Sequence, residues 1–227
     1  MSEIIIAIDG HSATGKSSTA KIVAKHLGYI YLDSGAMYRA TTLYFLNDKI
    51  DLGNAAQIKE ALEELTIEFR KDENGLPLTF LNGENVEEKI RSMEISSNVS
   101  KVSAIKAVRV AMVEQQRKLG ENKGIVMDGR DIGSVVFPNA ELKIFMTASA
   151  KVRAERRQKE LAEKGQKISF GEILKNVVDR DEQDSSRKES PLIKVEDAIE
   201  IDNSIMSFDE QVKQIIELAE AKITTAV

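Results

Sequence analysis

The segment Gly10–Ser17 constrains the fold of this chain more than any other stretch. It matches the pattern G-x-x-x-x-G-K-[ST] at every fixed position. A short apolar run, Ile4–Asp9, precedes it and is typical of a buried strand. Residues Ser18–Leu27 follow with apolar positions at helical spacing, up to Gly28. A glycine-rich loop between a strand and a helix predicts an α/β fold with a central parallel sheet.

The chemistry of this segment suits phosphate. Gly10 and Gly15 let the backbone curl so that its N–H groups point inward, and the helix N-terminus adds partial positive charge. Lys16 would reach the β- and γ-phosphates, and the Ser17 hydroxyl would complete a Mg²⁺ shell. A chance glycine loop ahead of a surface helix is the alternative, which the flanking strand and helix disfavour. We therefore expect Mg²⁺ and ATP, the latter bound by Gly10, His11, Ser12, Ala13, Thr14, Gly15, Lys16, Ser17 and Ser18.

Two loop positions depart from the more glycine-rich versions of this pattern. They are His11 and Ala13, and they leave the geometry of donor binding open rather than the type of reaction. We interpret His11 as a loop residue and not as a base, because nothing in the sequence pairs it with a carboxylate.

Composition excludes several classes of protein. The chain has 227 residues, enough for one α/β domain with an insertion or lid. It contains no run of 18 apolar residues and no charged-then-apolar signal segment, and its lack of cysteine suits the cytoplasm. A net charge of −5 argues against broad attraction to nucleic acid or anionic lipid. An anion site must therefore be a local cluster of arginines.

A second strand and a capped helix follow the loop. Tyr29–Leu32 is short and apolar, and Asp33 with Ser34 has the pattern of an N-cap for a helix over residues 36–46. Arg39 lies off the apolar face of that helix, so it and Ser34 can both face a cleft above the phosphate loop. A capped helix with a solvated arginine is the alternative.

The pattern of predicted helices and strands changes after this helix. A helix over 55–65 precedes two alternating strands, Thr66–Arg70 and Pro77–Leu81. Asn74–Gly75 predicts the turn between them, and Asn82–Gly83 predicts a further turn. The pattern indicates a small antiparallel β-hairpin inserted into the βαβα rhythm.

Polar residues follow the next buried strand. Residues 93–119 are expected to be helical, in two pieces that divide near Ser103, before the strand Gly124–Met127. Asp128–Gly133 then places two carboxylates beside Arg130 at the carboxyl end of a parallel strand, where α/β proteins bind ligands. A structural Asp–Arg pair that closes a turn is the alternative.

Arginines concentrate in the next helical part of the chain. Ser149 caps a polar helix over 151–164 that ends at Gly165, and a second helix over about 169–183 completes what looks like a lid hairpin. Three arginines share one face of the first helix, namely Arg153, Arg156 and Arg157. Pairing of these arginines with Glu160 and its neighbours is the alternative.

Three further charged residues, Arg180, Asp184 and Arg187, recur at helical spacing near the end of the second helix. They could form half of an anion clamp, or Asp184 could simply bridge the two arginines. The strands Glu141–Thr147 and Ala198–Asp202 bring the expected parallel sheet to five strands.

These residues resemble the bacterial cytidylate kinases, nucleoside-monophosphate kinases of the P-loop class, over essentially the whole chain. The most specific stretches are Asp33–Arg39, Asp128–Pro138 and the spacing Arg180–Arg187. The hairpin insertion is similar to the segment that sets bacterial cytidylate kinases apart from shorter relatives. The resemblance implies a three-layer α/β/α fold with a central five-stranded parallel sheet, the β-hairpin insertion and a helical lid.

The resemblance also implies residue roles. The acceptor phosphate would be contacted by Ser34, Arg39 and Arg130. The cytosine edge would be contacted by Ser100, Arg109 and Asp131. The ribose would be contacted by Asp184. The implied catalytic residues are Lys16, Arg130, Arg180 and Arg187, together with Arg153 and Arg157 from the lid. Arg187 is also implied to contact CMP, and Ser17 is the implied metal ligand.

The implied activity is ATP-dependent phosphorylation of CMP and dCMP in pyrimidine metabolism. We expect one domain over 1–227, with a core of 1–65, 120–150 and 190–227, a nucleotide-binding insertion at about 66–119 and a lid at about 151–189. We expect a cytoplasmic monomer that binds neither nucleic-acid polymer nor membrane.

The chemistry agrees with this resemblance independently. An acceptor phosphate is already anionic near neutral pH, so the reaction needs charge cancellation and in-line alignment rather than a strong base. Arginine suits that task because its planar fork binds phosphate bidentately. A lid that brings arginines also excludes water, which would otherwise accept the phosphoryl group.

Three other interpretations stay open. The chain could be a P-loop kinase for a small hydroxyl substrate, with Asp33 as the base. It could be a slow nucleotide-dependent switch that signals by shape. It could also be a guanylate-type or another monophosphate kinase.

Overall fold

The computed structural model describes residues 3–71, 73, 77–163 and 165–225. They divide into two compact units, Met1–Tyr31 with Gly120–Val227, and Leu32–Leu119. Within the described residues, every helix is too short or too polar to cross a bilayer. The predicted turn at Asn74–Gly75 and the predicted last residue of the helix over 151–164 lie outside the described residues.

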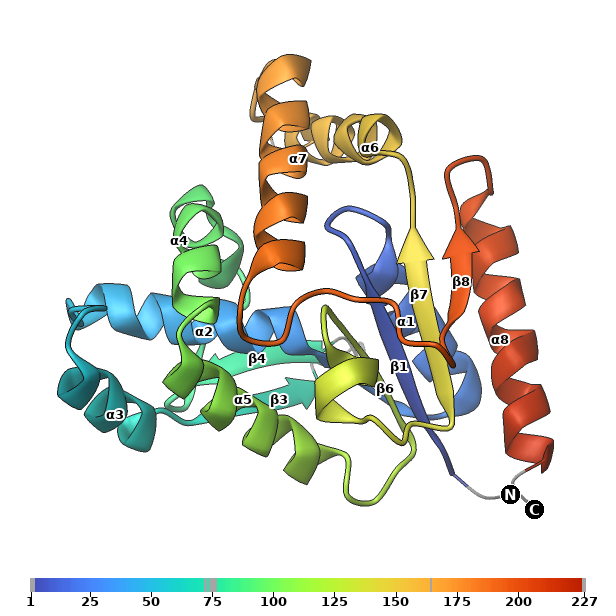
Figure 1. Ribbon diagram of the computed structural model, residues 1–227, viewed down its shortest axis with the longest axis horizontal. Helices are drawn as coiled ribbons and strands as arrows, with labels where there is room; N and C mark the ends of the chain where they lie inside the picture. Colours follow the sequence, from blue (N-terminus) through green and yellow to red (C-terminus); the bar gives the residue numbers. More distant parts are fainter. Residues whose placement is uncertain (1–2, 72, 74–76, 164, 226–227) are drawn as a thin grey trace. The chain divides into compact units, whose positions relative to one another are not determined.

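The first unit is built on a five-stranded parallel sheet in the order β2-β6-β1-β7-β8 (Figure 1). The strands of the sheet are β1 (Ile5–Gly10), β6 (Ile125–Gly129), β7 (Leu142–Thr147), β8 (Ile199–Asp202) and β2 (Ile30–Asp33), whose last two residues are counted with the second unit. Strand β1 is central, with Ile6 opposite Val126 on one side and Leu142 on the other. The loop that follows β1 therefore lies at the carboxyl edge of the sheet, as the sequence predicts.

The helices described in this unit are α1 (Lys16–Leu27), α6 (Ala150–Glu163), α7 (Phe170–Ser186), α8 (Phe208–Thr225) and a π-helical turn, η2 (Ile132–Val136). Helices α1 and α8 cover one face of the sheet. Alternate strand residues, such as Ile6 and Ile8, pack there against Val23 of α1 and Ile215 of α8. The strands of this sheet were predicted from short apolar runs and not from this alternation.

Helix ends are set by local chemistry. Helix α1 ends at Gly28, whose φ of +72° lets its N–H reach the carbonyls of Ala24 and Lys25. Helix α7 begins with a capping box in which Ser169 and Glu172 satisfy each other's backbone N–H groups. Helices α6 and α7 pack on each other through their own small cluster of Ala154, Leu161, Ile173 and Val177.

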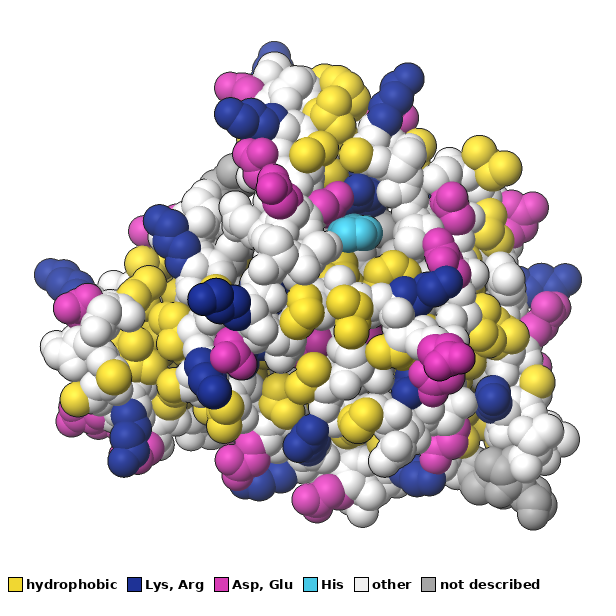
Figure 2. Space-filling view, viewed as in Figure 1, with side chains coloured by type: hydrophobic (Ala, Val, Ile, Leu, Met, Phe, Trp, Pro, Cys, Tyr) yellow, Lys and Arg dark blue, Asp and Glu magenta, His cyan; other side chains and the backbone are white. Residues whose placement is uncertain are grey.

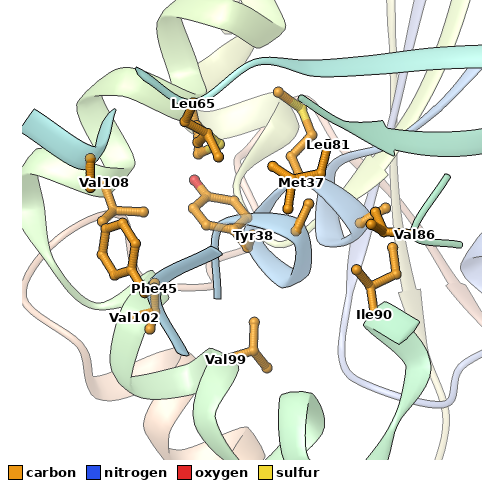
Figure 3. Close-up of a cluster of buried hydrophobic side chains, with 14 of the residues drawn as sticks. Met37, Tyr38, Phe45, Leu65, Leu81, Val86, Ile90, Val99, Val102 and Val108 are labelled. Atoms are coloured by element: carbon orange, nitrogen blue, oxygen red, sulfur yellow. The ribbon is translucent and has the colours of Figure 1, made fainter. Parts of the chain in front are cut away.

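The second unit combines helices with a small antiparallel sheet. Its elements are α2 (Ser34–Asn47), α3 (Ala55–Glu64), β3 (Ile67–Lys71), β4 (Pro77–Leu81), β5 (Glu84–Asn85), the 3₁₀ turn η1 (Lys89–Arg91), α4 (Met93–Ser103) and α5 (Lys106–Leu119). Figure 3 shows its core, where Met37, Tyr38 and Phe45 of α2 lie among side chains from the other elements, such as Val102 of α4 and Val108 of α5.

The fold class predicted from the sequence is confirmed, with one difference in the small sheet. A hairpin was predicted, and the sheet has three strands in the order β3-β4-β5. The turn predicted at Asn82–Gly83 is the reason. Both residues have positive φ, +48° and +83°, so they form a tight turn that pairs Leu81 with Glu84. Strand β5 has only two residues, too few for an alternating pattern to reveal it.

The phosphate loop depends on close backbone approach at Gly10. Its φ is +145°, and a Cβ atom there would lie 2.1 Å from the carbonyl oxygen of Met146 in β7. We expect Gly10→Ala to lower the free energy of unfolding by at least about 4 kcal/mol, because a fixed backbone atom occupies the space. Urea unfolding followed by circular dichroism measures this effect.

Gly28→Ala is the matched control. Gly28 also has positive φ, but nothing lies within 4 Å of a Cβ atom built on it. That change carries only the left-handed backbone penalty, about 1 kcal/mol. Equal losses in the two variants would contradict the role of close approach at Gly10.

Candidate active site

The lysine of the phosphate loop is held inside it. Lys16 Nζ donates to the carbonyl oxygen of His11 at 2.5 Å and to Thr14 Oγ1 at 3.3 Å. Burial, and next the charge of Arg130, lower the pKa of Lys16 to about 7. Ala13, between these partners, has a φ of +59°, so the loop uses a left-handed conformation at a residue that is not glycine.

A hydroxyl and a carboxylate meet at the start of α1. Ser17 Oγ donates to Asp128 Oδ2 at 2.8 Å, and the Tyr31 hydroxyl donates to Asp128 Oδ1 at 2.7 Å. Among the described residues no three His, Cys, Asp or Glu side chains gather to hold a metal ion. Mg²⁺ commonly uses one or two protein oxygen ligands, with water and substrate phosphates as the rest. Ser17 and Asp128 therefore fit Mg²⁺.

A buried carboxylate fixes the segment after β6. Asp9, at the end of β1, accepts backbone hydrogen bonds from Ile132 at 2.8 Å and Gly133 at 2.7 Å. Burial is the main reason that its pKa rises to about 6. These bonds hold the residues that directly follow Arg130 and Asp131. In the sequence, Asp9 is marked only as the last residue of an apolar strand, and no local pattern predicts its role.

Arginines and carboxylates form a cluster in the same unit. Arg130 Nε donates to Asp184 Oδ2 at 2.7 Å. Arg187 lies 3.8 Å from both Asp184 Oδ1 and Asp131 Oδ1. Burial would raise the pKa of Asp184, but the charges of Arg130, Arg180 and Arg187 outweigh it and hold the pKa below its usual value. The structure thus brings these predicted residues together around one carboxylate.

The three arginines predicted to share a face of α6 have different partners. Arg153 binds Asp181 of α7, with its side chain 4% exposed. Arg156 donates to the side-chain and backbone oxygens of Asn203 at 2.9 and 2.8 Å. Arg157 pairs with Glu160 at 2.8 Å, which is the alternative that the sequence left open for this group.

The reason given for interpreting His11 as a plain loop residue is wrong. Its Nδ1 lies 3.2 Å from Asp181 Oδ1, an electrostatic contact rather than an aligned hydrogen bond. Its ring also meets the edge of Phe145, with ring centres 6.4 Å apart. Asp181 is 170 positions away along the chain, so no local pattern could have paired it with His11.

Asn203 links the phosphate loop to the last helix. Its side chain is fully buried, and Nδ2 donates to the carbonyl oxygen of Thr14 at 2.7 Å and to Gln211 Oε1 at 2.5 Å. Gln211 Nε2 in turn donates to Thr19 Oγ1 at 2.8 Å. With the bond from Arg156, every polar atom of the Asn203 amide has a partner, which makes the network rigid. Sequence analysis did not identify this residue.

In the second unit, Asp33 organises the start of α2. Its Oδ1 caps the helix by accepting from Ala36 N at 2.8 Å, and its Oδ2 lies 3.0 Å from Arg39 and 3.6 Å from Arg91. Ser34, the first residue of α2, is buried. Arg91, of η1, was not among the predicted residues.

The other two predicted residues of this unit lie on α4 and α5. Arg109 is buried, donates to the carbonyl oxygen of Ser103 at 3.2 Å, and lies over the ring of Tyr38, 5.3 Å from its centre. Ser100 is half-buried one turn before Ser103.

Asn203→Asp tests the network around the phosphate loop. A carboxylate cannot donate, so oxygen would face oxygen at Thr14 and Gln211. We expect a loss of about 2–4 kcal/mol in the free energy of unfolding, measured with urea. Asn54→Asp is the control, because Asn54 only accepts bonds, as the N-cap of α3, and aspartate caps equally well. Similar losses in both variants would contradict the network.

Asp33→Asn separates the charge of Asp33 from its capping bond. Burial would raise the pKa of Asp33, but Arg39 and Arg91 hold it below its usual 3.8. The ionised form therefore stabilises the fold at pH values above about 4, and this contribution is lost as the pH falls further. We expect Asn, which still caps the helix, to cost about 1–3 kcal/mol at pH 7.

The difference between wild type and Asp33→Asn should shrink as the pH falls below about 4. Asp33→Ala, which also removes the cap, should cost about 1 kcal/mol more at all pH values. Thermal unfolding between pH 3 and 7 measures both. A difference that stays constant over this range would contradict the ionic contribution.

The chain is similar to known proteins over most of its length. The family model described as cytidylate kinase matches residues 6–221. The chain is 53% identical over 222 residues to the cytidylate kinase of Flavobacterium johnsoniae, covering 96% of each chain. It is 56% identical over 215 residues to that of Bacteroides fragilis, covering 93% of this chain and 94% of the other. A solved structure of an uncharacterized protein from Eubacterium ventriosum has a TM-score of 0.53 at 14% identity, covering 97% and 99%, and so shares the fold.

Proposed function

The chain belongs to the cytidylate kinase family, and on that premise we propose that it transfers the terminal phosphoryl group of ATP to CMP or dCMP. The observation that carries this proposal is the cluster around Asp184. The charge of Lys16 interacts with those of Arg130 and Asp184, and the charge of Asp184 interacts in turn with those of Arg130, Arg180 and Arg187. Fixed cations in this cluster suit two phosphate groups that repel each other.

The proposed mechanism uses positioning and charge. Lys16 binds the β- and γ-phosphates of ATP, whose backbone contacts come from the phosphate loop. Arg130, Arg180 and Arg187 stabilise the charge that develops between donor and acceptor. No general base is required, because the attacking oxygen of CMP is already anionic.

We also propose that Mg²⁺ accompanies ATP. Ser17 and Asp128 would hold it, directly or through water, because their oxygens already lie together at the start of α1. When bound, the ion supplies positive charge that neutralises the phosphate oxygens of the donor.

Acceptor contacts are proposed on the residues that match the family pattern. They are Ser34, Arg39 and Arg130 for the phosphate, Ser100, Arg109 and Asp131 for the cytosine, and Asp184 and Arg187 for the ribose and phosphate. Helices α6 and α7, within a lid over about 151–189, would contribute Arg153 and Arg157, and the insertion at about 66–119 would serve the acceptor nucleotide. We further propose a monomer that acts in the cytoplasm.

Asp33 is poorly suited to act as a base on a hydroxyl acceptor. Both of its carboxylate oxygens are engaged, and its pKa is held below the usual value, so it has little tendency to take up a proton. This supports the monophosphate acceptor over the small hydroxyl substrate.

A coupled assay that offers every nucleoside monophosphate, small hydroxyl acceptors and water with ATP·Mg²⁺ tests the proposal. We expect rapid transfer to CMP and dCMP, slow transfer to UMP, and little hydrolysis. Preference for GMP, for AMP or for a hydroxyl acceptor would overturn the proposed substrate. ATP hydrolysis without any acceptor would instead favour a nucleotide-dependent switch.

Base choice provides a sharper prediction. Asp131, which is buried, can accept from the 4-amino group of cytosine, whereas uracil would place an oxygen against the carboxylate. We expect Asp131→Ala to narrow the CMP/UMP ratio of kcat/KM by about ten- to a hundred-fold. Asp131→Asn should narrow it too, because an amide can donate to the 4-oxygen of uracil. An unchanged ratio in steady-state kinetics would remove Asp131 from base recognition.

A further inference from the structure

One carboxylate connects the phosphate loop to both lid helices. Asp181, on α7, receives two parallel hydrogen bonds from Arg153 of α6: NH1 to Oδ1 at 2.9 Å and NH2 to Oδ2 at 2.5 Å. The same Oδ1 lies 3.2 Å from His11 Nδ1 in the phosphate loop. Bidentate pairs of this kind fix orientation as well as distance. All of these residues belong to the first unit.

The guanidinium of Arg153 directs four of its five N–H groups at acceptors of the protein. Besides the bonds to Asp181, Nε donates to the carbonyl oxygen of Ala148 at 2.8 Å, and NH1 reaches the carbonyl oxygen of Ser12 at 3.4 Å. Each of its three nitrogens therefore has an acceptor, and the side chain is almost completely buried. A contact with phosphate through Nε or NH1 would require Arg153 to give up bonds to the protein.

The charge state of Asp181 favours this arrangement. Burial would raise its pKa, but His11 and Arg153 more than offset burial and lower the pKa to about 2. The carboxylate is therefore ionised at every pH at which the enzyme would work. Asp181 also follows Arg180 directly and precedes Asp184 by one turn, so whatever fixes Asp181 also fixes that part of α7.

We propose that Asp181 and Arg153 are a positioning pair. The pair holds the phosphate loop in place against α6 and α7, and it affects phosphoryl transfer by fixing the position of that loop. This inference rests on the proposed function, and it specifies how Arg153 contributes: it holds the loop at Ser12 and does not contact phosphate. Asp181 joins the reaction as a positioning residue, and the geometry of ATP binding depends on the pair more than that of the acceptor.

Two other roles give different results. If the pair only stabilises the fold, breaking it lowers stability and leaves kinetic constants unchanged. If Asp181 instead competes with phosphate for Arg153, removing its charge frees the arginine and tightens ATP binding.

Asp181→Asn is the first test, with Asp179→Asn as the matched control on the exposed side of the same helix. We expect Asp181→Asn to lower kcat/KM for ATP by about ten- to a hundred-fold, with the KM for CMP within about twofold of wild type. The dissociation constant of a non-hydrolysable ATP analogue, measured by calorimetry, should rise several-fold. Asp179→Asn should match wild type in all three.

Arg153→Lys is the second test, and it keeps a positive charge opposite Asp181 if Asp181→Asn proves too unstable to purify. A lysine side chain cannot form the two parallel hydrogen bonds to Asp181 and does not reach Ser12. We therefore expect Arg153→Lys to lower kcat/KM for ATP by as much as Asp181→Asn does. The double variant should be no worse than either single variant by more than about twofold, because each change breaks the same pair.

Three outcomes would overturn the proposal. The first is a folded Asp181→Asn variant whose kcat/KM for ATP equals that of wild type. The second is tighter binding of the ATP analogue by that variant. The third is a double variant in which the two single-variant decreases in kcat/KM multiply. Each is read against a wild-type enzyme that phosphorylates CMP. Failure of the wild type in the acceptor assay would overturn the proposed function itself, and the two failures are therefore distinguishable.

Discussion

Carboxylates pair with the arginines of the candidate site, and the arrangement of that site depends on this pairing. Moving a charged group out of water costs several kcal/mol unless opposite charges and hydrogen bonds replace the water. Asp184 supplies them for Arg130, and Asp181 supplies them for Arg153. Lys16, which shares this environment, responds with a pKa lowered to about 7. Without such carboxylates, the positive charges of the clustered arginines would repel one another and push the side chains apart.

Charge is distributed differently over the rest of the protein. Acidic and basic side chains are interspersed on the face that Figure 2 shows, in keeping with a net charge of −5. Exposed pairs such as Arg157 with Glu160 contribute little, about 0–1 kcal/mol, because water and salt screen them. In the buried pairs, by contrast, screening is weak and the geometry is fixed.

Backbone geometry sets the second condition for the site. Gly10 allows β1 to approach the carbonyl oxygen of Met146, and the Asn203 amide holds the loop carbonyl at Thr14. A loop shaped by such fixed contacts is preorganised, so little reorganisation is needed when phosphate arrives. Asp9 does the same for the segment after β6 through two backbone N–H groups.

The local features of this protein could be determined from the sequence by itself. The phosphate loop, the five parallel strands, the cap at Asp33 and the division of the long helix near Ser103 all depend on residues a few positions apart. The resemblance to a kinase family rested on the same short motifs. The sequence predicted neither strand β5, which has only two residues, nor the contact between His11 and the carboxylate of Asp181. Neither feature leaves a local pattern.

Only the tertiary structure decided which charge meets which. Arg130 binds Asp184, 54 positions away, and the Asn203 amide reaches Thr14 across 189 positions. With 32 basic and 37 acidic residues, the sequence permits very many pairings. Strand order and the packing of α6 against α7 select among them, because burial makes a mismatched charge far more costly than it would be in water.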